Sequence, residues 1–221
     1  MKKAFIVLLA LNVSVVFAQP PVRLGVHVDP LSTWLSPKSA DIEKDGSHVG
    51  FSWGMIVEYY FHPNYGLVSG LSMTFLGGNL MYKVPVDITV GSSGSETSIP
   101  LEAGTTVSFN SNYLSLPVAL KLKTNEIGYF TYYAQMGLRQ YINIGARATA
   151  SGSGLSKDNV SKEINLLNIS YFFGGGVEYK IGGNTSLTAG IFYDNGFVDV
   201  LSNDDHKAVY NFVTIRLGVL F

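Results

Sequence analysis

Apolar side chains alternate with polar or small ones along most of this chain, and the alternation is clearest in the last fifteen residues. In that segment Thr214, Arg216 and Gly218 each have an apolar residue on both sides. A repeat of two residues predicts a β-strand with one apolar face. The same alternation recurs seven times upstream, so eight strands are expected in all. The seven further strands are predicted at residues 22–29, 49–61, 67–76, 113–123, 129–143, 167–181 and 185–194.

The connections between the predicted strands alternate sharply in length. Three are short and contain ordinary hairpin residues, and they span residues 62–66, 124–128 and 182–184. Four are long and polar, and they span residues 36–48, 77–112, 144–165 and 195–206. Short turns on one side and long loops on the other are typical of outer-membrane barrels. Because an up-and-down sheet of even strand number can close on itself, it leaves no unpaired edge in lipid. Both chain ends are then expected in the periplasm, and the long loops outside the cell.

The polar face of the predicted strands separates a membrane barrel from a soluble one. In a soluble lipocalin-like barrel this face meets water and is rich in Lys and Glu, whereas here it consists of small residues. They are Gly50, Ser52, Gly54, Gly70, Ser72, Thr74, Ser115, Ala119, Ser170, Gly174, Gly176, Thr188, Gly190 and Gly218. Small side chains suit the interior of an eight-stranded barrel, which side chains fill. The predicted fold is therefore an all-β, eight-stranded antiparallel up-and-down transmembrane β-barrel, with a soluble secreted lipocalin-like ligand-binding barrel as the alternative.

The N-terminus predicts export to the bacterial outer membrane rather than retention in the cytoplasm. Lys2 and Lys3 precede an apolar run at residues 4–11, and the small residue Ala18 follows further apolar residues. This pattern predicts a signal peptide at residues 1–18, cleaved after Ala18, and a barrel domain at residues 19–221. The apolar run is too short to cross a bilayer as a helix. The chain has no cysteine, which excludes lipid attachment and disulfides together.

Composition and charge agree with a membrane barrel. Charged residues make up 14% of the chain, against roughly 25% in ordinary soluble domains. A formal net charge of -1, with no long block of one sign, gives no indication of nucleic-acid binding.

The four histidines, at positions 27, 48, 62 and 206, lack the spacing of a metal-binding motif. No metal and no cofactor are expected.

Aromatic residues gather near the ends of the predicted strands, where a membrane barrel has its two interfaces. Those beside the short turns and the C-terminus are Tyr59, Phe61, Tyr65, Tyr129, Phe130, Tyr132, Tyr179 and Phe221. Those nearer the long loops are Trp34, Trp53, Phe75, Tyr171 and Tyr193. Two aromatic belts are expected, and the alternative is the ordinary preference of aromatic residues for strands.

The end of the chain resembles a known signal. Phe221 is an aromatic last residue, and Ile215, Leu217 and Val219 precede it at every second position. This ending resembles the terminal signal that the outer-membrane assembly machinery reads, so that machinery and outer-membrane lipid are expected partners.

Two internal segments resemble one family of barrels. Residues 112–122, NYLSLPVALKL, and residues 174–179, GGGVEY, look like the PorT-like outer-membrane β-barrel proteins of Bacteroidetes. The likeness covers most of the mature chain. It implies an eight-stranded barrel in a family of which one member is an accessory of type IX protein secretion. Because these are barrel motifs, the resemblance implies architecture more strongly than activity.

Five charged residues are predicted to point into the lumen in its periplasmic half. They are Arg23, Glu58, Lys121, Glu178 and Arg216. Because charges in a narrow lumen are costly unless they are paired, we expect one ion-pair network that plugs the barrel. The alternative is a gate for small ions. Arg139 and Tyr141 lie further out on their strand, and for them we expect packing in the lumen only.

Enzymatic activity is not expected. His27 and Asp29 share the inward face of the first strand and Ser52 is inward on the next, so a Ser-His-Asp site is conceivable. Proximity in sequence does not establish that geometry, and a hydrogen-bonded lumen histidine explains His27 equally well. An outer-membrane enzyme acting on lipid or peptide is kept as an alternative, whereas a diffusion pore is disfavoured by the number of strands. The Gly174, Gly175 and Gly176 run is interpreted as a bulge or a tight corner.

The long connection at residues 77–112 carries its own alternation. Apolar residues recur at every second position from Tyr82 to Val90, a Gly-Ser stretch follows, and residues 105–109 can run back. A hairpin that projects beyond the membrane is one interpretation, and it can offer a strand edge to a protein partner. The other is a loop of no fixed role. We therefore expect a monomeric, non-catalytic barrel with a structural or interaction role, through its outer loops or as an accessory to protein secretion.

Overall fold

The computed structural model describes residues 22–92, 95–151, 154–203 and 205–221. The predicted signal peptide at residues 1–18 and its cleavage site after Ala18 lie outside these ranges. Within them, no helix is long and apolar enough to cross a bilayer.

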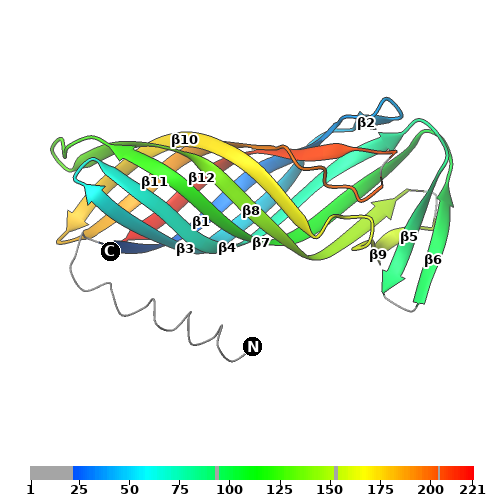
Figure 1. Ribbon diagram of the computed structural model, residues 1–221, viewed down its shortest axis with the longest axis horizontal. Coiled ribbons are helices and arrows are strands. Elements are labelled where there is room, and N and C mark those ends of the chain that lie inside the picture. Colours follow the sequence, from blue (N-terminus) through cyan, green and yellow to red (C-terminus); the bar gives the residue numbers. More distant parts are fainter. Residues whose placement is uncertain (1–21, 93–94, 152–153, 204) are drawn as a thin grey trace, which may run out of the picture.

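Eight long antiparallel strands form the wall of a closed barrel (Figure 1). They are β1 (Val22–Pro37), β3 (His48–His62), β4 (Tyr65–Tyr82), β7 (Thr105–Lys123), β8 (Phe130–Ala150), β10 (Leu167–Gly182), β11 (Thr185–Gly196) and β12 (Ala208–Leu220). Each strand pairs with the next along the chain, and β12 pairs with β1, which closes the barrel. The predicted eight-stranded up-and-down barrel is confirmed.

Four short strands lie in the connections that the sequence predicted as long loops. They are β2 (Ile42–Lys44), β5 (Val86–Ser92), β6 (Ser95–Leu101) and β9 (Ser156–Asn159). β2 pairs with β4, and β9 pairs with β8, so both extend the wall outward. β5 and β6 form a separate two-stranded sheet. All four lie at the end of the barrel remote from the C-terminus (Figure 1).

One detail of the predicted hairpin is wrong. Residues 105–109 do not return along residues 82–90, because they belong to β7 and pair with the end of β4 as far as Tyr82, opposite Thr105. The return strand of the hairpin is β6, which pairs with β5 from Val86, opposite Leu101, to the turn. The wall therefore continues well into the segment that the sequence predicted as a loop.

In the half of the barrel that carries the short turns, apolar side chains face outward. On β1, Val22, Val26 and Val28 are about half exposed, while His27 and Asp29 between and beside them are buried in the lumen. The same holds around the barrel, where Leu71, Leu138 and their counterparts form an exposed apolar belt. This is the arrangement predicted for lipid contact, and it is opposite to that of a lipocalin-like barrel.

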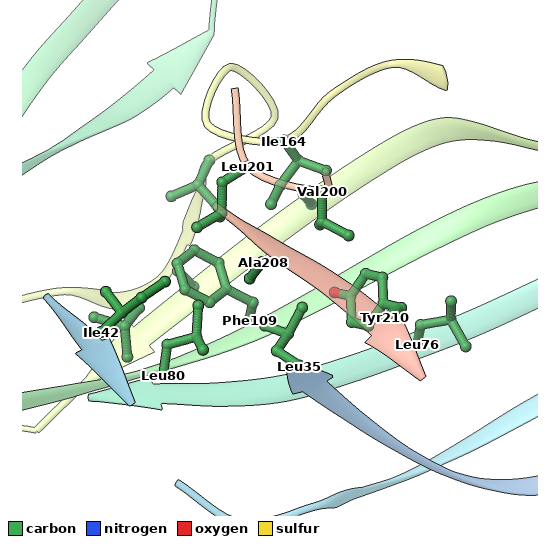
Figure 2. Packing of buried hydrophobic residues seen from close by; sticks show 14 of the residues in the cluster. Leu35, Ile42, Leu76, Leu80, Phe109, Ile164, Val200, Leu201, Ala208 and Tyr210 are labelled. Carbon is green, nitrogen blue, oxygen red and sulfur yellow. The ribbon is translucent and has the colours of Figure 1, made fainter. Parts of the chain in front are cut away.

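Toward the long loops, the chemistry of the two faces is exchanged. Above Pro30 on β1, Leu31 and Leu35 point inward and are buried, and Ser32 points outward. The buried side chains there form an outer apolar cluster (Figure 2). Its members include Leu31, Leu35, Ile42, Leu76, Leu80, Ile88, Leu101, Val107, Phe109, Ile164, Val200, Leu201, Tyr210 and Phe212. An apolar interior beneath a polar outer face is typical of β-structure in water, so the membrane-facing section ends near this height.

The three glycines of β10 do not form a bulge. Gly174, Gly175 and Gly176 pair in unbroken register with both β8 and β11. A Cβ atom at Gly176 would overlap the backbone oxygen of Ala189 and would lie 2.7 Å from the hydroxyl of Tyr133, and one at Gly174 would lie 2.6 Å from the ring of Phe192. Gly174 and Gly176 therefore make room for close strand pairing and for aromatic side chains in the lumen. The bulge in this hairpin lies instead between Lys180 and Gly182, beside the turn.

Candidate functional site

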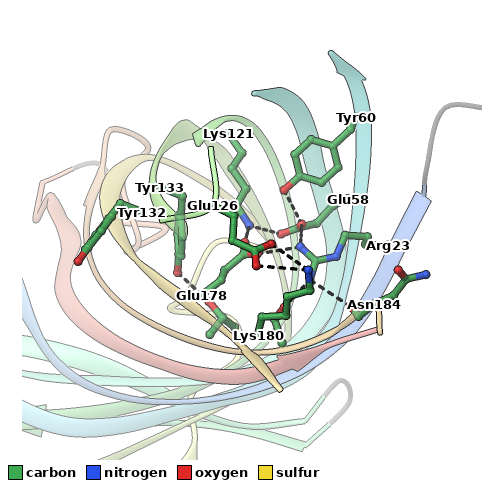
Figure 3. A network of polar contacts seen from close by, with 12 residues as sticks. Arg23, Glu58, Tyr60, Lys121, Glu126, Tyr132, Tyr133, Glu178, Lys180 and Asn184 are labelled. Carbon is green, nitrogen blue, oxygen red and sulfur yellow. Dashed lines mark hydrogen bonds and ion pairs between the residues drawn. The ribbon is translucent and has the colours of Figure 1, made fainter. Parts of the chain in front are cut away.

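A cluster of four charged residues fills the lumen near the short turns (Figure 3). Lys121 is 1% exposed, and its Nζ atom lies 2.5 Å from Oε1 of Glu58 and also contacts Glu178. Arg23 donates a 2.7 Å hydrogen bond to the second oxygen of Glu178. Two cations and two carboxylates make the group neutral, which a buried cluster requires. We call these four residues the periplasmic plug.

Neighbouring aromatic residues complete the periplasmic plug. The hydroxyl of Tyr60 donates a 2.8 Å hydrogen bond to Oε2 of Glu58. The ammonium of Lys121 lies 4.4 Å from the centre of the Tyr133 ring, a distance at which a cation is attracted to the ring face. The carboxylates and the ammonium thus have partners on several sides, so the plug is a closely packed and neutral group.

Arg216 does not belong to this network, contrary to the prediction. Its guanidinium lies 3.0 Å from Oδ2 of Asp29. The pairing of β1 with β12 brings Asp29 beside Arg216, because Val28 is opposite Leu217 and Leu31 is opposite Thr214. The sequence showed Asp29 as inward, but it could not show which cation the register would bring to it.

His27 links this second group to β4. Its Nδ1 atom lies 2.9 Å from Oδ2 of Asp29, and its Nε2 atom lies 2.9 Å from the hydroxyl of Ser72. Ser52, the serine that the sequence suggested, contacts Thr74 instead, at 3.0 Å. The reason is Gly54, which pairs with His27 on one side and with Ser72 on the other. Because Gly54 has no side chain, the imidazole reaches across it to Ser72.

The Asp29, His27 and Ser72 contacts follow the order of a hydrolytic triad, but the histidine and the serine are almost fully buried. Ser72 is 6% exposed and faces the filled lumen. Asp29 is in addition held by Arg216. A groove of about 790 Å³ runs over the outer face of the same strands. Most of the side chains that line it are apolar and belong to the lipid-facing belt, among them Trp53 and Leu71, and His27 and Ser72 also border it from between the strands.

A third buried pair joins Arg139 to Asp194 at 3.0 Å. The hydroxyl of Tyr141 lies 3.3 Å from the same oxygen of Asp194, and the Arg139 guanidinium lies over the ring of Phe172. The packing role expected for Arg139 and Tyr141 agrees with these contacts. Asp194 was not among the predicted lumen residues, although it lies two positions after Phe192 on the inward face of β11, which was a usable signal.

The long-loop end of the lumen is closed by the outer apolar cluster and by the loops that pack on it. Ile88 of β5 and Leu101 of β6 are both 2% exposed and belong to the cluster. The backbone N–H of Thr89 donates to Oε1 of Glu163 at 2.9 Å, and Lys162 forms an ion pair with Glu96. We call β2, the β5–β6 hairpin, β9 and residues 160–166, 197–203 and 205–207 the extracellular cap.

A further bond set ties two loops of the extracellular cap together. The side-chain amide of Asn165 donates to the backbone oxygens of Asp199 and Leu201, at 2.9 and 3.0 Å. Because Ile88, Leu101 and Thr89 bind the hairpin to these same neighbours, the hairpin lies folded against them and does not stand free.

In the ranges that the structure describes, no group of three or more His, Cys, Asp or Glu side chains is placed to hold a metal ion.

The side chains of the predicted C-terminal assembly signal lie on the outer surface. Ile215, Leu217 and Phe221 are about half exposed, and Val219 faces the same way. Phe221 and Leu24 exchange two backbone hydrogen bonds, of 2.8 and 3.0 Å. The terminal residue therefore completes the seam between β12 and β1.

Several solved structures of outer-membrane proteins have a similar backbone fold but low sequence identity to this chain. Neisserial surface protein A is 16% identical, with a TM-score of 0.49 over 90% of this chain and 95% of that chain. The outer membrane protein OprG from Pseudomonas aeruginosa is 11% identical, with a TM-score of 0.44 and coverage of 90% and 95%. The outer membrane protease OmpT from Escherichia coli is 8% identical, with a TM-score of 0.43 and coverage of 90% and 96%.

The comparison with curated protein sequences yields no match. A family model described as the outer membrane protein beta-barrel domain matches residues 17–202, which is most of the chain. The match includes seven of the eight wall strands in full, from β1 to β11. This chain therefore belongs to the family of outer membrane protein β-barrel domains.

Proposed function

We propose that this protein is a monomeric, non-catalytic and non-conducting outer-membrane barrel that binds a protein partner through its extracellular cap. The observation that carries the proposal is the contrast between the two ends. The periplasmic end is a short-turned, plugged cylinder, whereas the outer end is a folded structure with its own apolar core. A barrel that served only as a membrane anchor or a pore would need no such cap.

The lumen supports a role other than transport. The periplasmic plug, the Arg216–Asp29 pair and the Arg139–Asp194 pair fill successive parts of the interior. An eight-stranded barrel has an interior just wide enough for side chains. Among the residues that the structure describes, these buried pairs support a lumen that does not conduct solutes.

The cap supports a binding role because it is held in one arrangement. Apolar side chains from the hairpin and the loops share the outer apolar cluster with the strands of the wall. A surface fixed in this way loses little conformational entropy when it binds. The hairpin also offers strand edges, and an added strand from a partner can pair with such an edge.

Site-specific photocrosslinking on intact cells tests the proposal. A crosslinking residue is placed at Asp87 and at Thr97, which are exposed on the hairpin. The matched controls are Asn125 and Asn184, which are exposed at the periplasmic turns. We expect the same discrete adduct from both hairpin positions and none of that size from the turns. Adducts that arise only from the turn positions, or from no position, would contradict a role for the cap.

A more specific form of the proposal follows from the likeness to PorT-like barrels of Bacteroidetes. In that form the chain is an accessory of protein secretion, and the partner at the cap is an exported protein. Deleting the gene and measuring which proteins reach the cell surface tests this form. We expect specific exported proteins to accumulate in the periplasm, with recovery by the full chain and not by a chain lacking residues 84–103. Unchanged export would restrict the role to surface binding.

A further inference from the structure

A β-bulge in β8 changes which side chains face outward above the membrane belt. Below it, odd-numbered residues such as Tyr141 and Asn143 point into the lumen. Tyr113 pairs with Asn143, but the next residue of β7, Asn112, pairs with Gly145 and leaves Ile144 as an extra residue. One inserted residue exchanges the two faces of a strand. Above the bulge the even-numbered Ala146 and Ala148 are therefore buried, and Arg147 points outward.

The bulge opens a polar groove of about 450 Å³ on the outer face of β7, β8 and β9. Gly145 forms part of its floor, and a side chain added there would meet no atom within 4 Å. Arg147 lies between Asn110 of β7 and Asn159 of β9, with which it pairs across the sheet. The groove thus presents one guanidinium between two amides, and Asn112 and Ser161 also line it.

Several polar groups of this groove are free to bind a ligand, although the Ser161 hydroxyl accepts a hydrogen bond from the backbone N–H of Ala146. Among the residues that the structure describes, no hydrogen bond or ion pair engages the side chains of Arg147, Asn110 or Asn112. The oxygen of the Asn159 amide accepts a 2.9 Å bond from the backbone N–H of Ser161, which leaves its NH₂ group outward. The groove therefore supplies a cation and several hydrogen-bond donors, without an acidic residue among those that line it.

The height of the groove indicates what meets it. Ile142 and Ile144 are the last exposed large apolar residues of β8, and Ile144 also lines the groove. The apolar belt thus ends where the guanidinium and the amides begin. In a bilayer this is the level at which acyl chains give way to headgroups.

We propose that this groove binds the phosphorylated sugar headgroup of a glycolipid in the outer leaflet. Arg147 binds a phosphate, for which a guanidinium has matching bidentate geometry. The amides of Asn110, Asn112 and Asn159 bind sugar hydroxyls, and the acyl chains lie along the belt below Ile144. The site borders the extracellular cap, because Asn159 and Ser161 belong to both, but its ligand is a membrane lipid and not the protein partner proposed for the β5–β6 hairpin.

Native mass spectrometry of the purified barrel in detergent tests this site, with bisphosphorylated lipid A as the probe. We expect the parent to retain one lipid A, and Arg147→Gln to retain about tenfold less, since it loses one charge-assisted contact. Gly145→Leu, which fills the groove and keeps the charge, is expected to reduce retention as well. Lys207→Gln is the matched control, because it removes an exposed cation beside β1, across the barrel from β8, and its retention is expected to equal that of the parent.

Two further probes identify the chemistry that is recognised. Dephosphorylated lipid A is expected to bind the parent and Arg147→Gln equally weakly. Millimolar inorganic phosphate is expected to displace little of the bound lipid A. Equal retention by the parent and both groove variants would overturn the proposal. Complete displacement by inorganic phosphate would reduce the groove to a simple anion site and would also overturn the glycolipid assignment.

Discussion

Lys121 shows how a charge is held inside a narrow barrel. Its ammonium lies between Glu58 and Glu178, and Arg23 balances the remaining negative charge. Removing one partner of such a buried group leaves an uncompensated charge, whose cost exceeds the net value of the intact group. The plug is thus best tested by removing a single charge.

We predict that Lys121→Met destabilises the barrel by roughly 3–5 kcal/mol, because two buried carboxylates then share one guanidinium. The measurement is the urea midpoint of unfolding in detergent, followed by the change in gel mobility between folded and unfolded chains. Glu126→Gln is the control, since its ion pair with Lys180 is exposed and its loss should cost less than about 1 kcal/mol. Equal midpoints for Lys121→Met and the parent would show that the plug does not stabilise the fold.

Ser72 tests whether the His27 group is structural or catalytic. We predict that an alkyl fluorophosphonate, which labels activated serines, does not label the folded barrel, because Ser72 is buried and Asp29 is bound to Arg216. The gel readout is the labelled band of folded protein, with the same probe on a serine hydrolase as the positive control. A label on the parent that Ser72→Ala abolishes would restore the enzyme alternative.

The sequence predicted which side chains enter the lumen better than it predicted which of them meet. Arg23, Glu58, Lys121 and Glu178 come together as expected, whereas Arg216 pairs with Asp29. Alternation establishes the face of a strand, but contacts depend on the register between strands. Register here depends on turn geometry, which alternation does not reveal. Contacts also depend on residues such as Gly54, because its lack of a side chain lets His27 reach Ser72.

At the scale of elements, the β5–β6 hairpin depends on its neighbours. A two-stranded hairpin alone is marginally stable in water, and this one adds Ile88 and Leu101 to the outer apolar cluster. Its backbone is also tied to Glu163. The hairpin and the loop at residues 160–166 should therefore open together.

We predict that Ile88→Ala loosens the extracellular cap while the barrel stays closed. Deleting a buried Ile side chain to Ala costs roughly 2–5 kcal/mol, and here that cost falls on the packing of the hairpin. Hydrogen exchange should become faster in β5, β6 and residues 160–166 and stay unchanged in β11 and β12. The exposed Thr97→Ala is the control. Faster exchange throughout the wall would mean that the cap and the barrel fold as one unit.

We predict two separable roles for the terminal strand, in closing the barrel and in assembly. Phe221 closes the seam to β1 through its backbone, while its side chain lies on the outer surface. We predict that Phe221→Ser slows assembly in cells and leaves unfolded chains in the periplasm, yet changes the stability of the refolded barrel by less than about 1 kcal/mol, as surface substitutions do. Tyr179→Ser, an exposed aromatic residue away from the terminus, is the control. Normal assembly of Phe221→Ser would remove the assembly signal.

The eight strands could be predicted from alternation, but their outer ends could not. In the segment at residues 77–112, Leu80 faces inward and Asn79 faces outward, which reverses the chemistry of Leu71 and Ser72 lower on the same strand. A search for apolar residues on the lipid side therefore stops near Leu76 and reads the rest as a loop. The extension can be recognised only if the apolar face of a strand is allowed to switch from the outer side to the inner side where the wall leaves the membrane.

On the scale of the whole molecule, one wall serves two solvents. The apolar belt faces lipid around a polar lumen, and the outer extension faces water around an apolar core. The membrane section buries its polar side chains away from lipid, and the outer section buries its apolar side chains away from water. Because the sections share β4, β7 and β8, the cap is positioned directly by the membrane barrel, without a flexible linker between them.

This construction closes the lumen more than once, which leads to a prediction for ion conduction. We expect no conductance steps from the parent in planar bilayers, and none from Glu58→Ala, because the outer apolar cluster and the Arg139–Asp194 pair still fill the lumen. Replacing residues 84–103 by a short Gly-Ser turn should also leave the barrel silent, since the periplasmic plug is intact. A porin reconstituted in the same bilayer serves as the positive control. Conductance steps from the parent would show an open lumen. Steps from Glu58→Ala alone would show that the periplasmic plug is a gate, and the cap would then control the outer opening of the lumen.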